Sequence, residues 1–281
     1  STAVGRHVMS AAAETLTPVT LELGGKSPTV IGRSADVDEA AARIVTGKLL
    51  NAGQICLAPD YLFVPRDSVG SVIEAVRRSA AECYPTLREN PQYASVISEK
   101  HAQRLVDYME DARTRGVELT LVNPGGEEFD PVADRRLPLA IAVDPPDDAR
   151  IMQEEIFGPI LPIVPYDSFD EVVSRINDGP RPLALYYFGS DRKERERLVR
   201  ETVSGAVCVN DVVIHVSMED LPLGGVGASG MGRYHGRDGF LEFTHRKAVF
   251  RQGFISTAKF FRPPYDEKTR ALLKRLTGVS L

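Results

Sequence analysis

The sequence contains no tryptophan, only three cysteines and five histidines, and no long run of apolar residues. The cysteines form no CxxC motif and no close pair with a histidine, which argues against a disulfide framework or a zinc site and favours a reducing compartment. No apolar segment approaches the roughly 18 residues that cross a bilayer, and the first 25 residues lack the apolar centre of a signal peptide. We therefore expect a cytoplasmic protein with no membrane span and no bound metal.

An excess of positive charge is also missing, because 34 Lys and Arg stand against 39 Asp and Glu, for a formal net charge of −5. Such a chain has no general attraction to nucleic acid or to an acidic membrane surface. Its 281 residues, 43% hydrophobic and 26% charged, are ordinary for a globular protein and suffice for one large or two modest domains. Composition therefore excludes classes of partner without indicating an activity.

Strand and helix patterns alternate along most of the chain, which predicts an α/β protein built on one sheet. Apolar residues at a spacing of 3.6 indicate the helices, and short β-branched or aromatic runs indicate the strands. The expected strands are 19–22, 29–31, 61–64, 117–122, 139–143, 160–164, 183–188 and 206–209, and the expected helices are 5–15, 37–52, 68–83, 99–114, 168–177, 191–203 and a short terminal helix near 270–276.

Cys56 differs from the other two cysteines in its setting. Asp36 can cap a helix that ends near Gly53, so the thiol of Cys56 is expected on a loop fixed by a rigid element, where catalytic nucleophiles are common. The alternative is that a lone cysteine is a small buried hydrophobe. Cys83 fits that alternative, because its spacing places it on the inner face of a helix, and so does Cys208, which lies in an apolar run typical of a buried strand.

Four motifs around and beyond Cys56 occur in a recognisable order. Leu21 to Lys26 reads LELGGK, Asn51 to Cys56 reads NAGQIC, Glu154 to Pro159 reads EEIFGP, and Leu221 to Gly230 reads LPLGGVGASG. In this order they resemble the general-base, nucleophile, nicotinamide-ribose and domain-closing segments of the aldehyde dehydrogenase superfamily. The segment 229–236, SGMGRYHG, is most similar to the class 3 branch, which includes fatty, aromatic and coniferyl-type aldehyde dehydrogenases.

The resemblance implies a fold and a domain organisation. It implies a three-layer α/β/α catalytic domain over residues 24–230, a remnant of a Rossmann-like cofactor domain over 1–23, and a C-terminal segment over 231–281. The tail of that segment could pack on the partner subunit of a homodimer, or its helix could be solvated. The family has a long portion before the match begins, including an asparagine that binds the oxyanion. We therefore expect this chain to be the C-terminal part of a larger enzyme, with low activity by itself.

The resemblance also implies catalytic roles for two residues. Cys56 would attack an aldehyde to give a thiohemiacetal and then a thioester, and Glu22 would be the base that activates water for hydrolysis. The residues themselves support this role for Glu22, because Leu21 and Leu23 would turn inward and leave its carboxylate on the other face of a strand. Partial burial would raise its pKa toward neutrality.

The cofactor implied by the resemblance is NAD or NADP, and the sequence does not discriminate between the two. Glu155 would accept hydrogen bonds from the ribose hydroxyls, and Phe157 would pack near the nicotinamide. Gly24 would allow close approach to the cofactor. Ser1 and Val4 would lie along its pyrophosphate and adenine side, at the start of a helix.

One further motif, GVGASG at 225–230, matches the G-x-G-x-x-G dinucleotide fingerprint. Pro222 precedes it, and the glycines that follow predict no helix, so we expect a tight structural loop there and not a phosphate site.

Two other functions remain open. Cys56 and Glu22 could hydrolyse acyl groups without a cofactor, or the chain could be a non-catalytic module of an assembly. The leading hypothesis is NAD(P)-dependent oxidation of an aromatic or medium-chain aldehyde, with coniferyl-type aldehydes as one candidate, to the carboxylate.

Overall fold

The computed structural model describes residues 2–256, 258 and 262–278, so Ser1 and its expected contact with the cofactor lie outside the described residues. The chain forms two compact units, residues 1–243 and residues 244–281. The first unit contains every residue of the candidate site that the structure describes, and the two units are described separately.

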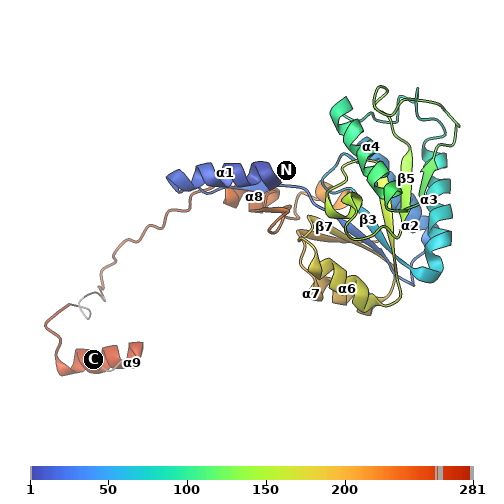
Figure 1. The fold of residues 1–281 in the computed structure, drawn as a ribbon. Helices are drawn as coiled ribbons and strands as arrows, with labels where there is room; N and C mark the ends of the chain where they lie inside the picture. Colours follow the sequence, from blue (N-terminus) through green and yellow to red (C-terminus); the bar gives the residue numbers. More distant parts are fainter. Residues whose placement is uncertain (1, 257, 259–261, 279–281) are drawn as a thin grey trace. The chain divides into compact units, whose positions relative to one another are not determined.

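A seven-stranded sheet forms the centre of the first unit (Figure 1). All neighbouring strands are parallel except the pair at one edge, β4 and β5, which is antiparallel. In sheet order the strands are β4 (Leu119–Val122), β5 (Leu139–Val143), β6 (Ile160–Tyr166), β3 (Tyr61–Pro65), β2 (Pro28–Ile31), β7 (Ala184–Phe188) and β8 (Ala206–Val209).

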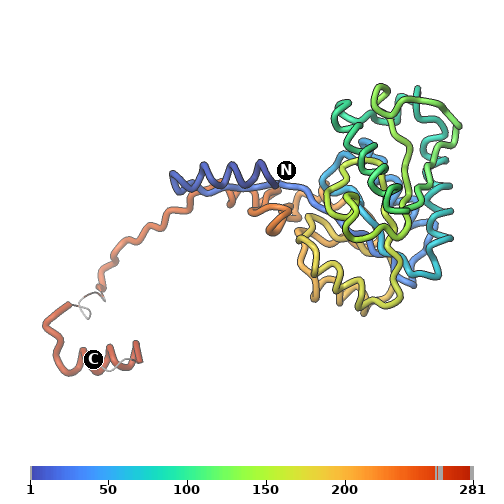
Figure 2. Tube along the Cα trace, viewed as in Figure 1, coloured from blue at the N-terminus to red at the C-terminus, as the bar shows by residue number. Residues whose placement is uncertain are grey.

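Helices cover both faces of this sheet, because successive side chains of a strand point to opposite faces. In β5, Leu139 and Ile141 join the apolar cluster that includes α2 and α3, whereas Ala140 and Ala142 join the cluster of α4. A third cluster packs the sheet against α6 and α7. The helices are α2 (Val37–Leu49), α3 (Val69–Cys83), α4 (Glu99–Thr114), α5 (Arg150–Gln153), α6 (Phe169–Asp178) and α7 (Arg192–Glu201). The expected three-layer α/β/α fold is confirmed, and the chain trace in Figure 2 follows the same alternation.

A two-stranded antiparallel sheet pairs β1 (Leu21–Glu22) with β9 (Gly230–Met231). Gly230 has φ of 140°, and a Cβ there would overlap the carbonyl oxygen of Leu21, so only glycine lets the two strands approach. The remaining elements of this unit are α1 (Thr2–Thr15), α8 (Gly236–Glu242) and the 3₁₀ turns η1 (Leu50–Gly53), η2 (Arg66–Ser68) and η3 (Ile214–Ser217).

Three expectations from the sequence were wrong. Residues after the GVGASG loop do form a helix, α8, in which Gly239 packs against Tyr234. Cys83 is exposed, since it is the last residue of α3 and lies beyond the buried stripe that includes Val76. Cys208 is only partly buried, because β8 is an edge strand of the sheet.

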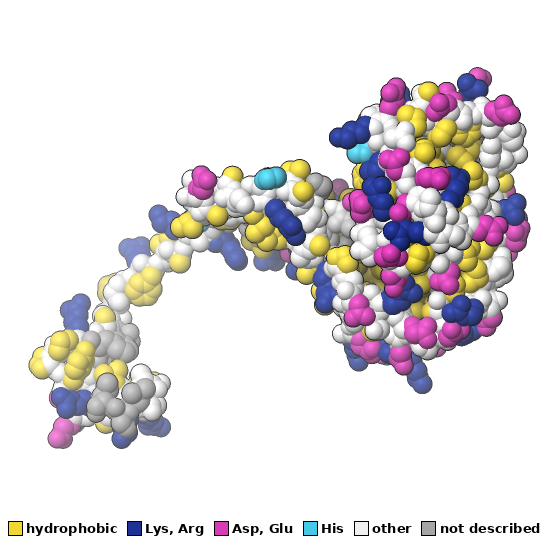
Figure 3. Space-filling model, viewed as in Figure 1, with side chains coloured by type: hydrophobic (Ala, Val, Ile, Leu, Met, Phe, Trp, Pro, Cys, Tyr) yellow, Lys and Arg dark blue, Asp and Glu magenta, His cyan; other side chains and the backbone are white. Residues whose placement is uncertain are grey.

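The second unit contains α9 (Glu267–Thr277), which Asp266 caps by accepting a hydrogen bond from the Thr269 N–H at 2.8 Å. This confirms the expected terminal helix. Among the described residues, no helix combines the length and the apolar character that a membrane crossing requires. Figure 3 shows basic and acidic side chains interleaved over the visible face of the sheet-containing unit. Exposed ion pairs of this unit include Arg66–Asp167.

Candidate active site

Three of the four motifs meet at one edge of the large sheet because of its strand order. β6, β3 and β2 are consecutive neighbours and run parallel, so the segments that precede them lie at the same amino edge. These segments are 22–26 before β2, 54–60 before β3 and 154–159 before β6. The topology therefore brings together the base, nucleophile and ribose motifs that the sequence spreads over more than 130 residues.

The loop that carries Cys56 is held by a sharp turn after α2. Asp36 caps α2 as expected, accepting hydrogen bonds from two backbone N–H groups at 3.1 Å. Beyond the end of the helix, Asn51, Ala52 and Gly53 all have positive φ, of 52°, 54° and 76°. A Cβ on Gly53 would lie 2.6 Å from the carbonyl oxygen of Gly158, so this glycine lets the nucleophile segment approach the ribose motif.

Gln54 fixes the same loop from within. Its Nε2 donates hydrogen bonds to the carbonyl oxygens of Asn51 at 2.9 Å and Ser95 at 3.1 Å, and its Oε1 accepts one from the Ile97 N–H at 2.9 Å. The following turn is closed by a hydrogen bond from the Ala58 N–H to the Ile55 carbonyl oxygen at 3.0 Å. Cys56 lies inside that turn, held by the backbone on both sides.

The Cys56 thiol is partly buried and lies within electrostatic range of two carboxylates. Burial raises the pKa of Cys56 above its ordinary value, and the charges of Glu155 and Glu22 raise it further. Hydrogen bonds from the backbone N–H groups of Cys56 and Leu57 act in the opposite direction. The thiol therefore shares one site with both acidic residues that the motifs single out.

Glu22 lies on the open face of β1, with Leu21 buried on the other side, as the sequence pattern predicts. Desolvation raises the pKa of Glu22 to about 7. A carboxyl group with that pKa can take a proton from water near neutrality, which is the property a general base needs. Burial raises the pKa of the Tyr234 hydroxyl, and the charges of Glu22 and Cys56 raise it further. Tyr234 therefore lies within electrostatic range of both residues.

Glu155 is partly buried, and its carboxylate lies directly against the backbone of Gly24. A Cβ at Gly24 would overlap both carboxylate oxygens of Glu155, so the position requires glycine. Burial raises the pKa of Glu155 to about 7, and the charge of Asp60 adds to this effect, while a hydrogen bond from the Gly25 N–H opposes it. Phe157, two residues further on, has φ of 48° and a side chain that is 37% exposed.

Two buried charged groups near the site are not predicted from the sequence. Lys48 is 1% exposed, and burial lowers the pKa of Lys48 to about 8 against the opposing charge of Asp60. The signal for Lys48 was its position, because it continues the buried stripe of α2 that includes Ile44. Asp60 is 3% exposed and pairs with Lys26, and the motifs name Lys26 only as the last residue of LELGGK.

A cavity of about 240 Å³ between α1 and the small sheet adjoins the base motif. Its lining includes Gly5, Leu21 and Leu23, which present mainly apolar surface. Val4 is 59% exposed on α1 and is not among the lining residues, so its contact with the cofactor stays a prediction.

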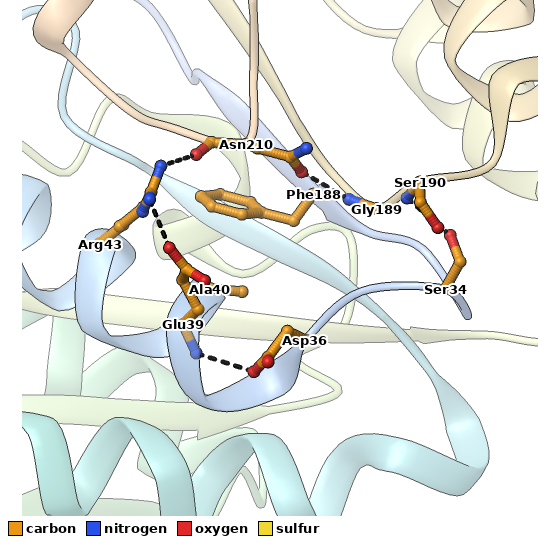
Figure 4. Close-up of a pocket in the computed structure, with 9 residues that line it drawn as sticks. All are labelled: Ser34, Asp36, Glu39, Ala40, Arg43, Phe188, Gly189, Ser190 and Asn210. Carbon is orange, nitrogen blue, oxygen red and sulfur yellow. Dashed lines mark hydrogen bonds and ion pairs between the residues drawn. The ribbon is translucent and has the colours of Figure 1, made fainter.

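A larger hollow, of about 370 Å³, lies at the opposite, carboxyl edge of the sheet (Figure 4). Its polar groups satisfy one another. Arg43 pairs with Glu39 and also donates to the carbonyl oxygen of Asn210, and the Asn210 Oδ1 accepts from the Gly189 N–H at 2.8 Å. Ser34 Oγ accepts from the N–H groups of residues 190 and 191. The hollow contains none of the residues that the motifs predict.

Comparison with known proteins shows the family of the chain. Residues 1–249 match the model of the Aldehyde dehydrogenase family. The chain belongs to that family. It is 49% identical over 275 residues to the "Probable coniferyl aldehyde dehydrogenase" of Caulobacter vibrioides, which covers 97% of this chain and 57% of that protein. The expected similarity to the branch with coniferyl-type enzymes is thus confirmed, and the chain spans little more than half the length of that relative.

Solved structures show the same relationship. The structure titled "Substrate bound state of Staphylococcus Aureus AldH" superposes with a TM-score of 0.88 at 37% identity, covering 98% of this chain and 59% of that one. The Mycobacterium tuberculosis aldehyde dehydrogenase complexed with NAD+ superposes with a TM-score of 0.79 at 30% identity, covering 92% of this chain and 53% of that one.

Proposed function

We propose that the natural polypeptide carrying this chain oxidises an aldehyde to the carboxylate, with NAD or NADP as the oxidant. The observation that carries the proposal is that Cys56, Glu22 and Glu155 lie together at one edge of the sheet. There the charges of both carboxylates raise the pKa of the thiol. Family membership supports the reaction class, and the arrangement of the three residues supports the part that we propose for each.

The thiolate of Cys56 adds to the aldehyde carbon, which places a negative charge on the former carbonyl oxygen. The backbone N–H of Cys56 is one donor available to that oxygen. When the nicotinamide is bound, it supplies the acceptor for the hydride that leaves the carbon, and a thioester on Cys56 results. Glu22 then takes a proton from water as the water attacks the thioester, so the carboxylic acid leaves and the thiolate returns.

The residues present fit a nicotinamide cofactor. The Glu155 carboxylate is an acceptor suited to ribose hydroxyls. Because Gly24 has no Cβ, it leaves the space that this carboxylate occupies. Phe157 offers an exposed ring two residues away, and Leu23 lines the neighbouring apolar cavity. One solved relative was crystallised with NAD+, which supports a cofactor of this class.

An aromatic aldehyde is the substrate class we favour. The partly buried side chains packed with Cys56 against the main apolar cluster include Ile55, Val213, Val216 and Tyr234, which offer an apolar surface to a ring. The similarity to a probable coniferyl aldehyde dehydrogenase supports the same choice.

The test is aldehyde-dependent formation of NADH or NADPH by the natural polypeptide, compared with two single variants. Cys56→Ser should lower kcat by about 10³-fold or more, since the nucleophile is lost. Cys83→Ser is the matched control and should retain full activity, because that cysteine is exposed at the end of α3. Full oxidation by the Cys56→Ser variant would refute the proposal.

A further inference from the structure

A buried ion pair underlies the candidate site. Lys26 Nζ pairs with Asp60 Oδ2, and the two side chains are only 9% and 5% exposed. Lys26 lies in the base motif and precedes β2, whereas Asp60 follows the Cys56 loop and immediately precedes β3. The pair therefore joins the segments of the base and of the nucleophile.

The same two side chains also bind the backbone on both sides of Glu155. Lys26 Nζ donates to the carbonyl oxygens of Ile151 at 2.7 Å and Glu154 at 3.1 Å. Asp60 Oδ1 accepts from the Ile156 N–H at 3.0 Å. The peptide groups just before and just after Glu155 are thus both held by this ion pair.

Arg104 of α4 binds two further backbone carbonyl groups of the same segment. Its Nη1 donates to the Glu155 carbonyl oxygen at 3.2 Å and its Nη2 to the Ile156 carbonyl oxygen at 2.7 Å. Four backbone groups around Glu155, the carbonyl groups of residues 154, 155 and 156 and the N–H of Ile156, are therefore bound by side chains from other segments, while the Glu155 carboxylate itself lies against Gly24.

We propose that Lys26 and Asp60 are positioning residues, which fix the Glu155 backbone so that its carboxylate stays beside Gly24 and Cys56. Their bonds leave Glu155 little freedom to move away, because both flanking peptides are bound to the segments that lead into β2 and β3. For the oxidation reaction this role rests on the proposed function, whereas the placement of Glu155 beside the thiol can be tested without it.

A purely stabilising role explains the arrangement less well. A buried ion pair often adds little to stability, because desolvation offsets the attraction between the charges. Here the spare hydrogen-bonding capacity of both partners is directed to the backbone that flanks one acidic residue.

The test uses the double variant Lys26→Met/Asp60→Asn in the natural polypeptide, and alkylation is quantified on the Cys56 peptide by mass spectrometry so that Cys56 is the reporter thiol. Removing both charges together avoids leaving one buried and unpaired. The measurement is the rate of Cys56 alkylation by iodoacetamide as a function of pH, without cofactor. The matched control is Arg66→Met/Asp167→Asn, an exposed ion pair at the other end of β3 and β6.

Because the Glu155 charge raises the pKa of Cys56, a displaced carboxylate should increase the thiolate fraction. We expect the double variant to be alkylated about threefold faster at pH 8 than its parent. Glu155→Gln should give a similar increase, and adding it to the double variant should change little more. An unchanged rate in the double variant beside a faster rate in Glu155→Gln would overturn the proposal, as would an unchanged rate in Glu155→Gln.

A second measurement separates this proposal from the proposed function. In aldehyde oxidation the double variant should raise KM for NAD or NADP about tenfold, while the exposed-pair control leaves it unchanged. A parent protein that oxidises no aldehyde, yet shows the expected alkylation pattern, would refute the function and support the positioning role. A parent that oxidises aldehydes with the same KM in the double variant would refute the positioning role.

Discussion

The two edges of the seven-stranded sheet differ in how their polar groups are satisfied. The hollow at the carboxyl edge, of about 370 Å³, is larger than the cavity of about 240 Å³ that adjoins the base motif. Its charged group Arg43, however, is bound by Glu39 and by the carbonyl oxygen of Asn210. At the amino edge Glu22 and Glu155 both have a pKa raised to about 7 by desolvation, and both act on a thiol. The candidate site is therefore indicated by carboxyl groups with a raised pKa and not by the volume of the hollow.

This difference between the two edges indicates which edge of the sheet carries the candidate site. Parallel α/β sheets commonly bind ligands at the carboxyl ends of their strands. Here the loops that precede β2, β3 and β6 carry the residues that the motifs single out, and the polar groups of the opposite edge are bound to one another. Variants at the two edges should consequently behave differently, and the following predictions compare them.

The largest effect is expected at Glu22. Glu22→Gln should lower the rate of thioester hydrolysis by about 10²–10⁴-fold, since the base that activates water is lost. In the parent, turnover should rise with pH around pH 7, because the carboxylate must be unprotonated to accept a proton. The check is kcat against pH for both proteins, and the same rise near pH 7 in the variant would exclude Glu22 as the base.

A smaller loss is expected from Gly24→Ala. The new Cβ would overlap the Glu155 carboxylate and displace it, which should lower kcat/KM by roughly 10–100-fold. Gly70→Ala is the control, because a Cβ at Gly70 in α3 meets nothing within 4 Å. That change should leave activity intact and raise the free energy of unfolding by up to about 1 kcal/mol. Equal activity in both variants would contradict the placement of Glu155.

The charge at Glu155 should also appear in stability. Its pKa is raised to about 7 from an ordinary value of 4.5, so the folded state binds a proton that the unfolded state has lost between those pH values. Stability from this group is therefore present below about pH 4.5 and falls as pH rises toward 7. The substitution Glu155→Gln should therefore stabilise the protein more at pH 8 than at pH 4. The gain in the free energy of unfolding over the parent should be larger at pH 8 by on the order of 1–2 kcal/mol. Urea unfolding at both pH values is the check, and a larger gain at pH 4 would be the wrong sign.

The smallest effect is expected at the carboxyl edge. Glu39→Gln/Arg43→Met removes an exposed ion pair, which should change the free energy of unfolding by about 0.2–1 kcal/mol. Activity should stay within about twofold of the parent, because the pair lies at the other end of the sheet from Cys56. A tenfold loss of kcat/KM with retained folding would show that this hollow takes part in the reaction.

Most of the fold could be predicted from periodicity, because its helices and strands are regular and their caps are explicit. Asp36 caps α2 as expected, and α4 begins and ends where its apolar stripe indicates. Errors fell where tertiary contacts outweigh local pattern. The segment 236–242 forms a helix that packs against Tyr234 despite its two glycines, and β8 is less buried than its apolar sequence suggests because it is an edge strand.

The candidate site could be predicted as a set of motifs but not as a geometry. Cys56, Glu22 and Glu155 were found through resemblance, and the strand order then explains why they meet. Lys26 and Asp60 carry no signal of their own in the sequence, because their role depends on the distant Glu154 and Ile156 backbone.

The most direct test is to locate the covalent intermediate. Glu22→Gln in the natural polypeptide should be mixed with an aromatic aldehyde and NAD or NADP, quenched in acid, digested and examined by mass spectrometry. Slow hydrolysis should leave the acyl group as a thioester on the peptide that contains Cys56. An acyl group on the Cys83 or Cys208 peptide, or none on any cysteine while aldehyde is oxidised, would contradict the account.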